Sequence, residues 1–261
     1  MSTTVNVNYH VKKDFVQSFL FDGDGVIGNL VSPELAPTQV EAEDLRGGGS
    51  EMPSFASDGL VFLHRPSQVS PDPKTHAWEA RYETELERIL TDQLGAQEVI
   101  VFDHTVRVDD PDSARKPARN VHNDYSEAGA HARLIDLVGE DRAGEFHRDG
   151  FGFVNVWRPV ENPIQSSPLG FIRPDTISAA DWVDIQLVYP NRIGQILGVV
   201  ANPKHHWFFL SEMTPDEVAI FNIYDNTGRP QLAHSALDLP ADAKSPFPRK
   251  SVESRTLVRY G

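Results

Sequence analysis

The chain has 261 residues, of which 39% are hydrophobic and 24% charged, a composition that fits one large folded domain. Acidic residues (38) outnumber basic ones (24), and the formal net charge is −14. This acidity argues against a nucleic acid or a membrane surface as partner, because both attract clustered Lys and Arg. The chain has no cysteine, which excludes a disulfide framework, a thiolate metal site and a cysteine nucleophile.

The sequence shows neither a signal peptide nor a membrane-spanning segment. Residues 1–15 lack the apolar core of a signal peptide, and no apolar run approaches membrane-spanning length. We therefore expect a cytoplasmic protein. We also expect a single domain over residues 1–261, in which residues 1–75 add strands and a long loop to a core formed by residues 76–261.

The N-terminal part combines a strand pattern with a loop pattern. Residues 4–30 alternate apolar and polar side chains in places, as an antiparallel strand does. Residues 31–58 are rich in Pro, Gly, Ser and acidic side chains, and they predict a long surface loop. The glycines of this loop make it a candidate lid.

Between these two stretches, Asp22-Gly23-Asp24-Gly25 resembles the nucleophile loop of haloacid-dehalogenase-type phosphatases. That family has a parallel α/β fold with further Ser/Thr, Lys and carboxylate motifs, which we cannot place in this chain. Gly permits positive φ, and Asp hydrogen-bonds to its own backbone, so the same residues are ordinary turn formers. We interpret the segment as a strand that enters a tight turn, with a phosphatase as the less favoured alternative.

The rest of the chain predicts one helix and many short strands. Residues 75–94 show a helical stripe that includes Trp78, Tyr82 and Leu86, and Gly95 ends it. Strand patterns follow at 98–106, 151–160, 184–190, 194–200, 206–210, 217–224 and 253–260. Short strands without crossover helices predict a mainly β fold with flanking helices, built as an antiparallel barrel or a double-sheet jelly roll.

The segment VHNDYS (121–126) places His122 and Asp124 two residues apart. In an extended strand residues i and i+2 face the same side, so an imidazole and a carboxylate would meet at one point. Two histidines and one carboxylate on one face of an open site form the facial triad of non-haem Fe(II) oxygenases. His234 in AHSAL is the expected second histidine, and the pair His205-His206 competes with it.

Arg249 and Ser251 open the last predicted strand. An Arg forms a bidentate, charge-assisted pair with a carboxylate, and a nearby hydroxyl adds one more donor. The distal carboxylate of 2-oxoglutarate needs such a set of donors.

Several motifs, in this order, resemble one family. The chain is similar to the Fe(II)/2-oxoglutarate oxygenases of secondary metabolism, which include gibberellin desaturase-like, cephamycin hydroxylase-like and aspirochlorine-type hydroxylase/desaturase proteins. The similar segments are VFDHTVR (101–107), VHNDYS (121–126), NVWRPV (155–160), HHWFFLSEMTPDEVAIFNIYDN (205–226), AHSAL (233–237) and PRKSVESRTLV (248–258). The resemblance runs from about residue 76 to the end and is weaker in the N-terminal third.

This resemblance implies a double-stranded β-helix core, with Fe(II) held by His122, Asp124 and His234. It implies 2-oxoglutarate held by Arg249 and Ser251, with O₂ as the further co-substrate. The substrate implied is a small secondary metabolite or amino-acid derivative, which C–H abstraction would hydroxylate, desaturate or cyclise.

Two further residues are candidates for binding the co-substrate. The interval from His234 to Arg249 is longer than is usual in the family, so Arg255 is a rival binder of the carboxylate. Asn155 is a candidate for binding 2-oxoglutarate or substrate, with Trp157 expected on the opposite side of its strand.

Four residues are candidates for substrate binding, each with a structural role as the alternative: His206, Arg158, Arg107 and Tyr125. A jelly-roll binding or accessory subunit without turnover is the alternative function for the whole chain. A homodimer is a possible state of assembly.

Overall fold

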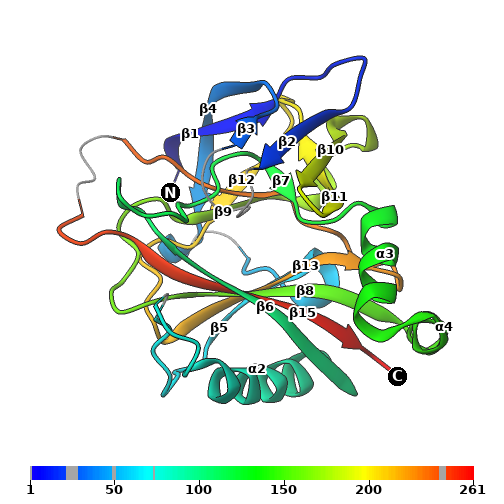
Figure 1. Ribbon diagram of the computed structural model, residues 1–261. Helices are drawn as coiled ribbons and strands as arrows, with labels where there is room; N and C mark the ends of the chain where they lie inside the picture. Colours follow the sequence, from blue (N-terminus) through cyan, green and yellow to red (C-terminus); the bar gives the residue numbers. More distant parts are fainter. Residues whose placement is uncertain (1, 22–28, 49–50, 73, 241–244) are drawn as a thin grey trace.

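The computed structural model describes residues 2–21, 29–48, 51–72, 74–240 and 245–261, and it has two β-sheets stacked face to face (Figure 1). The ten-stranded sheet has the order β1-β4-β12-β9-β14-β7-β11-β10-β2-β3, and the five-stranded sheet has the order β5-β13-β8-β15-β6. Helices lie on the outside of this pair of sheets (Figure 1). The predicted mainly β jelly-roll core with flanking helices is confirmed.

The strands of the larger sheet are β1 (Ser2–His10), β2 (Gln17–Phe21), β3 (Asn29–Val31), β4 (Leu35–Asp44), β7 (His122–Asn123), β9 (Leu169–Ile172), β10 (Trp182–Tyr189), β11 (Arg192–Val199), β12 (Trp207–Phe209) and β14 (His234–Ala236). Those of the smaller sheet are β5 (Leu60–His64), β6 (Glu98–Val108), β8 (Phe151–Pro159), β13 (Glu217–Asp225) and β15 (Lys250–Arg259). The helices are α1 (Phe55–Asp58), α2 (Glu79–Leu94), α3 (Glu127–Val138) and α4 (Glu140–Asp149), with 3₁₀ turns η1 (Leu45–Gly47), η2 (Pro174–Thr176) and η3 (Ala179–Asp181). Among the described residues, no helix is both long and apolar enough to span a membrane.

Strand alternation separates the apolar side chains of the smaller sheet into two layers. Phe153 and Trp157 of β8 face the larger sheet and pack with aromatic residues such as Phe171 and Phe221. The intervening residues of β8 face α2 and pack against its apolar stripe. Because residues i and i+2 share a face, Trp157 lies on the same side as Asn155, and the expectation that it lies opposite was wrong.

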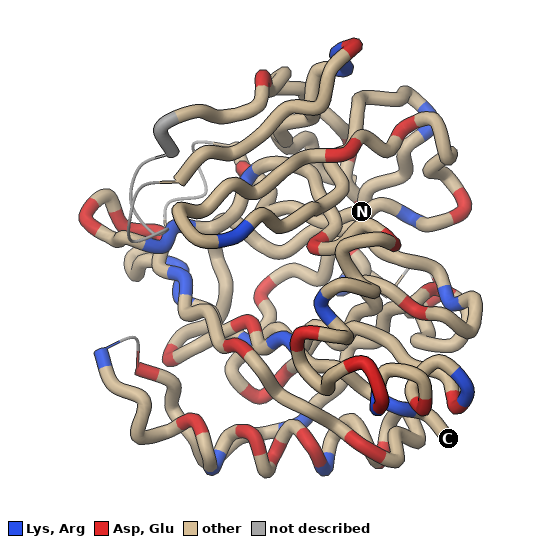
Figure 2. Tube along the Cα trace, turned by 45° about the vertical axis from the view of Figure 1, so that its right-hand side comes forward, with Lys and Arg blue, Asp and Glu red and all other residues tan. Residues whose placement is uncertain are grey.

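α2 covers the outer face of the smaller sheet (Figure 1). Its buried stripe is Tyr82, Leu86, Ile89 and Leu90, as the sequence predicted. The helix begins at Glu79 rather than at residue 75, and it ends at Gly95, which has a φ of 67°. Acidic positions outnumber basic ones along α2 (Figure 2).

The prediction of a surface loop over residues 31–58 was wrong for much of that range. β4 pairs with β1 from Leu35 to Glu43 and also pairs with β12, so it lies inside the larger sheet. Local composition favoured a loop, but this long-range pairing outweighs the weak local preference. A strand held on both edges cannot act as a lid. The phosphatase-like Asp22-Gly23-Asp24-Gly25 segment lies outside the described residues, and β2 leads toward it as a strand.

Candidate metal centre and active site

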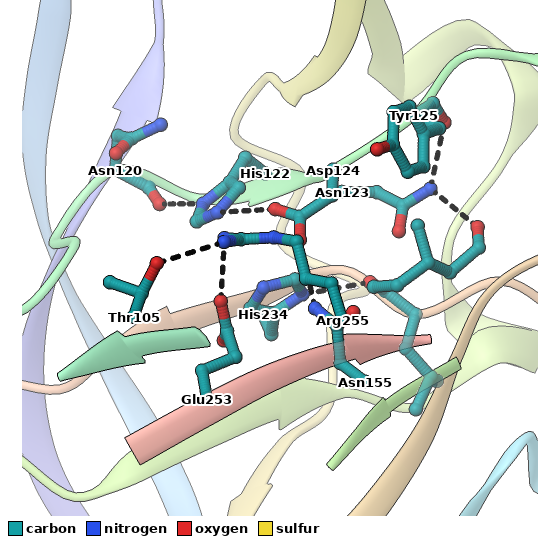
Figure 3. A network of polar contacts seen from close by, with 12 residues as sticks. Thr105, Asn120, His122, Asn123, Asp124, Tyr125, Asn155, His234, Glu253 and Arg255 are labelled. Carbon is teal, nitrogen blue, oxygen red and sulfur yellow. Dashed lines mark hydrogen bonds and ion pairs between the residues drawn. The ribbon is translucent and has the colours of Figure 1, made fainter. Parts of the chain in front are cut away.

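Three predicted ligands converge between the two sheets (Figure 3). β7 and β14 pair His122 directly with His234, and Asp124 follows β7. Ligand atoms of the three residues lie within 4.8 Å of one another. His122 Nε2 is 3.4 Å from Asp124 Oδ1, and the two imidazole ring centroids are 4.5 Å apart. This spacing allows one ion to contact all three side chains.

The backbone fixes the tautomer of both histidines. His122 Nδ1 lies 2.8 Å from the carbonyl oxygen of Asn120, and His234 Nδ1 lies 3.2 Å from that of Leu232. A carbonyl oxygen accepts and never donates, so each Nδ1 carries the proton and each Nε2 keeps its lone pair for a metal. Burial lowers the pKa of His234 to about 3. His234 is therefore a neutral imidazole, the form that binds metals.

Asp124 is held from the smaller sheet. Asn155 Nδ2 donates to Asp124 Oδ2 at 2.8 Å, and Arg255 Nε donates to the same oxygen at 3.1 Å. β8 and β15 pair Asn155 with Arg255, so adjacent strands deliver both donors. Burial favours the neutral carboxyl, but the charge of Arg255 outweighs it and holds the pKa of Asp124 well below its usual value. The carboxylate is thus ionised, with Oδ2 bound by the protein and Oδ1 directed at His122.

Arg255 is fully occupied by protein acceptors. Besides its bond to Asp124, its Nη1 donates to Asp103 at 2.6 Å and to Thr105 at 3.1 Å, and its Nη2 donates to Glu253 at 2.6 Å. The alternative that placed Arg255 on the co-substrate carboxylate is corrected accordingly, because each nitrogen of the guanidinium already has a partner. Asp103, Thr105 and Glu253 were missed by the sequence reasoning. The antiparallel register of β6 on β15 pairs Asp103 with Arg255 and Thr105 with Glu253, and that register was not available from the sequence.

Arg249 and Ser251 present donors that lack acceptors. Arg249 is 4% exposed, and its guanidinium lies 5.2 Å from the centroid of the Trp157 ring. Among the described residues, Arg249 Nε, Arg249 Nη1 and Ser251 Oγ are buried without a hydrogen-bond partner. Burial, followed by the charge of Arg107, lowers the pKa of Arg249 to about 9. A buried donor without a partner is costly, so these groups fit an anion.

Arg107 lies beside this pair of residues. It stands opposite Ser251 in the β6–β15 register, and its Nη1 donates to the carbonyl oxygen of Lys116 at 2.9 Å. Burial lowers the pKa of Arg107, while the charge of Glu253 acts in the opposite direction. Arg107 therefore lies next to Ser251 in the sheet, and its assignment to substrate binding stays a prediction. Tyr125 packs on Phe153 with ring centroids 4.9 Å apart, next to Asp124.

Two of the predicted substrate-binding residues lie away from the ligands. Arg158 faces α2, where it donates to Tyr82 Oη at 3.2 Å and to the carbonyl oxygens of Arg65 and Pro215 at 2.6 and 2.7 Å. Because it is three residues after Asn155, it falls on the opposite face of β8. The side chain of His206 is 51% exposed and lies 3.3 Å from Glu43. Both assignments to substrate binding are corrected to structural and surface positions.

A groove of about 740 Å³ opens beside the start of α3, and its lining includes Ser126, His131, Trp182, Gln195 and Tyr224. None of the predicted site residues is among the described residues that line it.

The donor set fits a non-haem iron that binds a keto acid. Two neutral imidazoles and one ionised carboxylate are the ligands of Fe(II) sites that leave positions open for co-substrates. The buried Arg249 and Ser251 donors fit the second carboxylate of a diacid. The residues present therefore match Fe(II) and 2-oxoglutarate together.

Comparisons with known proteins agree with this geometry. Residues 24–259 match a family model described as "Oxidoreductase/YMDC permease-like domain". The chain is 29% identical to hydroxylase/desaturase efuI of Hormonema carpetanum, over 84% of the chain and 82% of that relative. It is 27% identical to alpha-ketoglutarate-dependent dioxygenase tstK of Talaromyces stipitatus, over 97% of the chain and 99% of that relative.

Among solved structures, the iron and alpha-ketoglutarate-dependent endoperoxidase NvfI superposes with a TM-score of 0.84. The two proteins are 22% identical, and the match covers 100% of this chain and 98% of NvfI. At this identity the match shows the fold. The family resemblance predicted from the sequence is confirmed by these comparisons taken together.

Proposed function

The chain belongs to the Fe(II)/2-oxoglutarate-dependent oxygenases, and from this membership we propose that it oxidises a C–H bond of a small secondary metabolite or amino-acid derivative. Its co-substrates are 2-oxoglutarate and O₂. The names of its relatives include hydroxylase, desaturase and dioxygenase, and the outcome for this chain is hydroxylation, desaturation or ring closure. Which of these occurs depends on where the substrate carbon lies relative to the metal.

The observation that carries the proposal is the convergence of His122, Asp124 and His234 with both Nδ1 atoms bonded to carbonyls. We assign these three residues as the iron ligands. We assign Arg249 and Ser251 as the binders of the distal carboxylate of 2-oxoglutarate, on the basis of their buried donors. Bound Fe(II) with its co-substrates supplies the oxidising power, and succinate and CO₂ are released.

The protein's own contribution is to orient the ligands and to keep the site dry. Asn155 and Arg255 keep Asp124 ionised and restrict its rotation through Oδ2. Phe221 and Phe171 flank the ring of His234, with centroids at 5.0 and 6.4 Å. Such an apolar wall excludes water and prevents side reactions of the oxidant.

Anaerobic titration of the metal-free protein with Fe(II) and then 2-oxoglutarate tests this assignment. Wild type should develop the weak visible metal-to-ligand charge-transfer band. His122→Ala and His234→Ala should not, because the iron loses a ligand. Arg249→Ala should need at least about tenfold more 2-oxoglutarate, the loss expected for one charge-assisted pair. His147→Ala, in an exposed position on α4, is the matched control and should behave as wild type.

Two results would contradict the proposal. A band that survives in both histidine variants would move the iron elsewhere. Wild-type protein that neither retains Fe(II) nor develops a band would favour a jelly-roll binding or accessory subunit. Cytoplasmic location and a single domain remain predictions. Light scattering of the purified protein distinguishes a monomer from a homodimer.

A further inference from the structure

A histidine with no role in the sequence interpretation lies beside the proposed iron ligands. β1 runs parallel to the segment before His122: Asn8 bridges Asn120, and the backbone N–H of Val121 donates to the carbonyl oxygen of Asn8 at 2.9 Å. Two residues further along, the His10 ring lies against Gly198, the residue of β11 that pairs with His122. Side chains of directly paired residues face the same side of a sheet. The His10 ring fills the space of a Gly198 side chain, so it lies on the His122 side.

A glycine makes room for the His10 ring. Gly198 of β11 pairs with His122 of β7. A Cβ placed on Gly198 would lie 2.6 Å from Cδ2 of His10, well inside van der Waals contact. Phe19 of β2 packs against the ring edge to face, with centroids 6.5 Å apart. The ring is therefore held in one place by β2 and β11 rather than free to turn to solvent.

The polar atoms of this ring are unsatisfied by the protein. His10 is 2% exposed, and within the described part of the chain neither of its ring nitrogens has a hydrogen-bond partner. An imidazole ring carries at least one N–H donor in either protonation state. A buried donor that lacks an acceptor costs free energy until a ligand supplies one.

The other sides of the triad are already occupied. Asn155 and Arg255 bind the outer oxygen of Asp124, and Phe221 covers His234. Several buried donors of the described residues lack acceptors. Those of His104 and Arg158 lie on the α2 side of the smaller sheet, and those of Arg259 and Tyr260 lie at the end of β15. The remaining ones are at His10, on the His122 side, and at Arg249 with Ser251. 2-Oxoglutarate has a keto acid at one end and a carboxylate at the other. A diacid bound at the metal through its keto acid would offer an acceptor to each set of donors.

We propose that His10 is a positioning residue that donates a hydrogen bond to the keto-acid end of 2-oxoglutarate, while Arg249 holds the distal carboxylate. This inference rests on the proposed function. It gives the N-terminal strand β1, where the family resemblance is weakest, a direct part in the co-substrate site.

The test uses the full chain loaded anaerobically with Fe(II) and titrated with 2-oxoglutarate, so that it needs no substrate. His10→Phe keeps the size of the ring and removes both nitrogens, and His10→Leu makes the same comparison if the Phe variant fails to fold. His10→Gln retains an N–H donor. His147→Phe is the matched control, because His147 stacks on His131 at a centroid distance of 4.8 Å, on α4. Iron content is measured for every variant by chelation with a chromogenic ligand.

We expect equal iron content throughout. His10→Phe and His10→Leu should raise the Kd of 2-oxoglutarate about tenfold and shift the charge-transfer band, because one charge-assisted hydrogen bond is lost. His10→Gln should recover most of the affinity, and His147→Phe should match wild type.

The inference is overturned if His10→Phe binds 2-oxoglutarate with the wild-type Kd and band position. It is also overturned if His10→Gln is as weak as His10→Phe, since the ring would then act through packing alone. Failure of the proposed function is distinct from both, because it would appear in wild type as the absence of any band.

Discussion

Replacing Arg255 by Met should lower the free energy of unfolding of the metal-free protein by about 3 kcal/mol, because it leaves buried carboxylates without their partner. Arg255 Nε is 3.1 Å from Asp124 Oδ2, and its Nη2 is 2.6 Å from Glu253 Oε1. The three side chains are 18%, 12% and 9% exposed. At this burial water cannot replace the lost hydrogen bonds, and Met retains the apolar stem that packs in the sheet interface.

The effect should depend on pH. The pKa of Asp124 is lowered in the folded state, so its stabilising contribution is present above the pKa of the unfolded chain, about 4, and is lost as the pH falls through the folded pKa. Arg255→Met removes the strongest attraction that lowers this pKa. The difference in unfolding free energy between wild type and variant should therefore be largest near pH 7 and decrease as the pH is lowered toward and below about 4.

Urea unfolding followed by tryptophan fluorescence measures these energies. A double-mutant cycle with Asp124→Asn should give a coupling energy of about 1–3 kcal/mol. Arg142→Met is the control, because its pair with Glu98 joins side chains that are 48% and 25% exposed, where water screens the charges and the pair adds little to stability. A coupling energy below about 0.5 kcal/mol, or an equal cost in the two Arg→Met variants, would refute the assigned role of Arg255.

Three further predictions use the same unfolding assay. Gly198→Ala should lower the free energy of unfolding by about 1–3 kcal/mol, because the new Cβ would lie 2.6 Å from His10. At Gly144, inside α4, a new Cβ would lie 3.8 Å from the nearest atom, so Gly144→Ala should raise the free energy of unfolding by about 0.5–1 kcal/mol. Equal effects at the two glycines would contradict the packing described for His10. Arg158→Met should lower the free energy of unfolding by about 2–4 kcal/mol. It should leave the 2-oxoglutarate titration unchanged, because Arg158 faces α2. A selective loss of 2-oxoglutarate binding would show instead that Arg158 belongs to the binding site. Burial opposes the ionisation of Asp181, but hydrogen bonds from Asn202 and Ser178 lower its pKa to about 2. The stability that ionised Asp181 contributes is therefore present above about pH 4 and is lost as the pH falls toward 2. Asp181→Asn should remove this part of the loss of stability in acid, and an unchanged dependence of the unfolding free energy on pH would disprove the prediction.

Much of the metal site could be predicted from the sequence because its signals are local. The spacing of His122 and Asp124 places them together wherever the backbone is extended, and the second histidine and the Arg follow in chain order. The strands of the smaller sheet carry dense apolar and aromatic patterns, so most of their positions were predicted to within a few residues.

Positions decided by pairing between distant strands were the ones that failed. β4 was predicted as a loop, because nothing in its own composition indicates that β1 and β12 lie on its two edges. Arg158 and Trp157 were assigned to the wrong faces of β8, an error that the period of two could have prevented.

Residue types and their order therefore predicted the mainly β class, His122, Asp124 and His234 as the candidate iron ligands, and an arginine for a carboxylate. The three-dimensional packing established which of two arginines is open to a ligand. Arg255 lies within β15 and Arg249 directly precedes that strand. Arg255 meets four protein acceptors, whereas Arg249 keeps two nitrogens without one. That difference arises from the register of β6 and β8 on β15, which depends on contacts between residues more than 90 positions apart in the chain. The same is true of His10, whose place beside His122 exists only because β1 folds back onto the segment before β7.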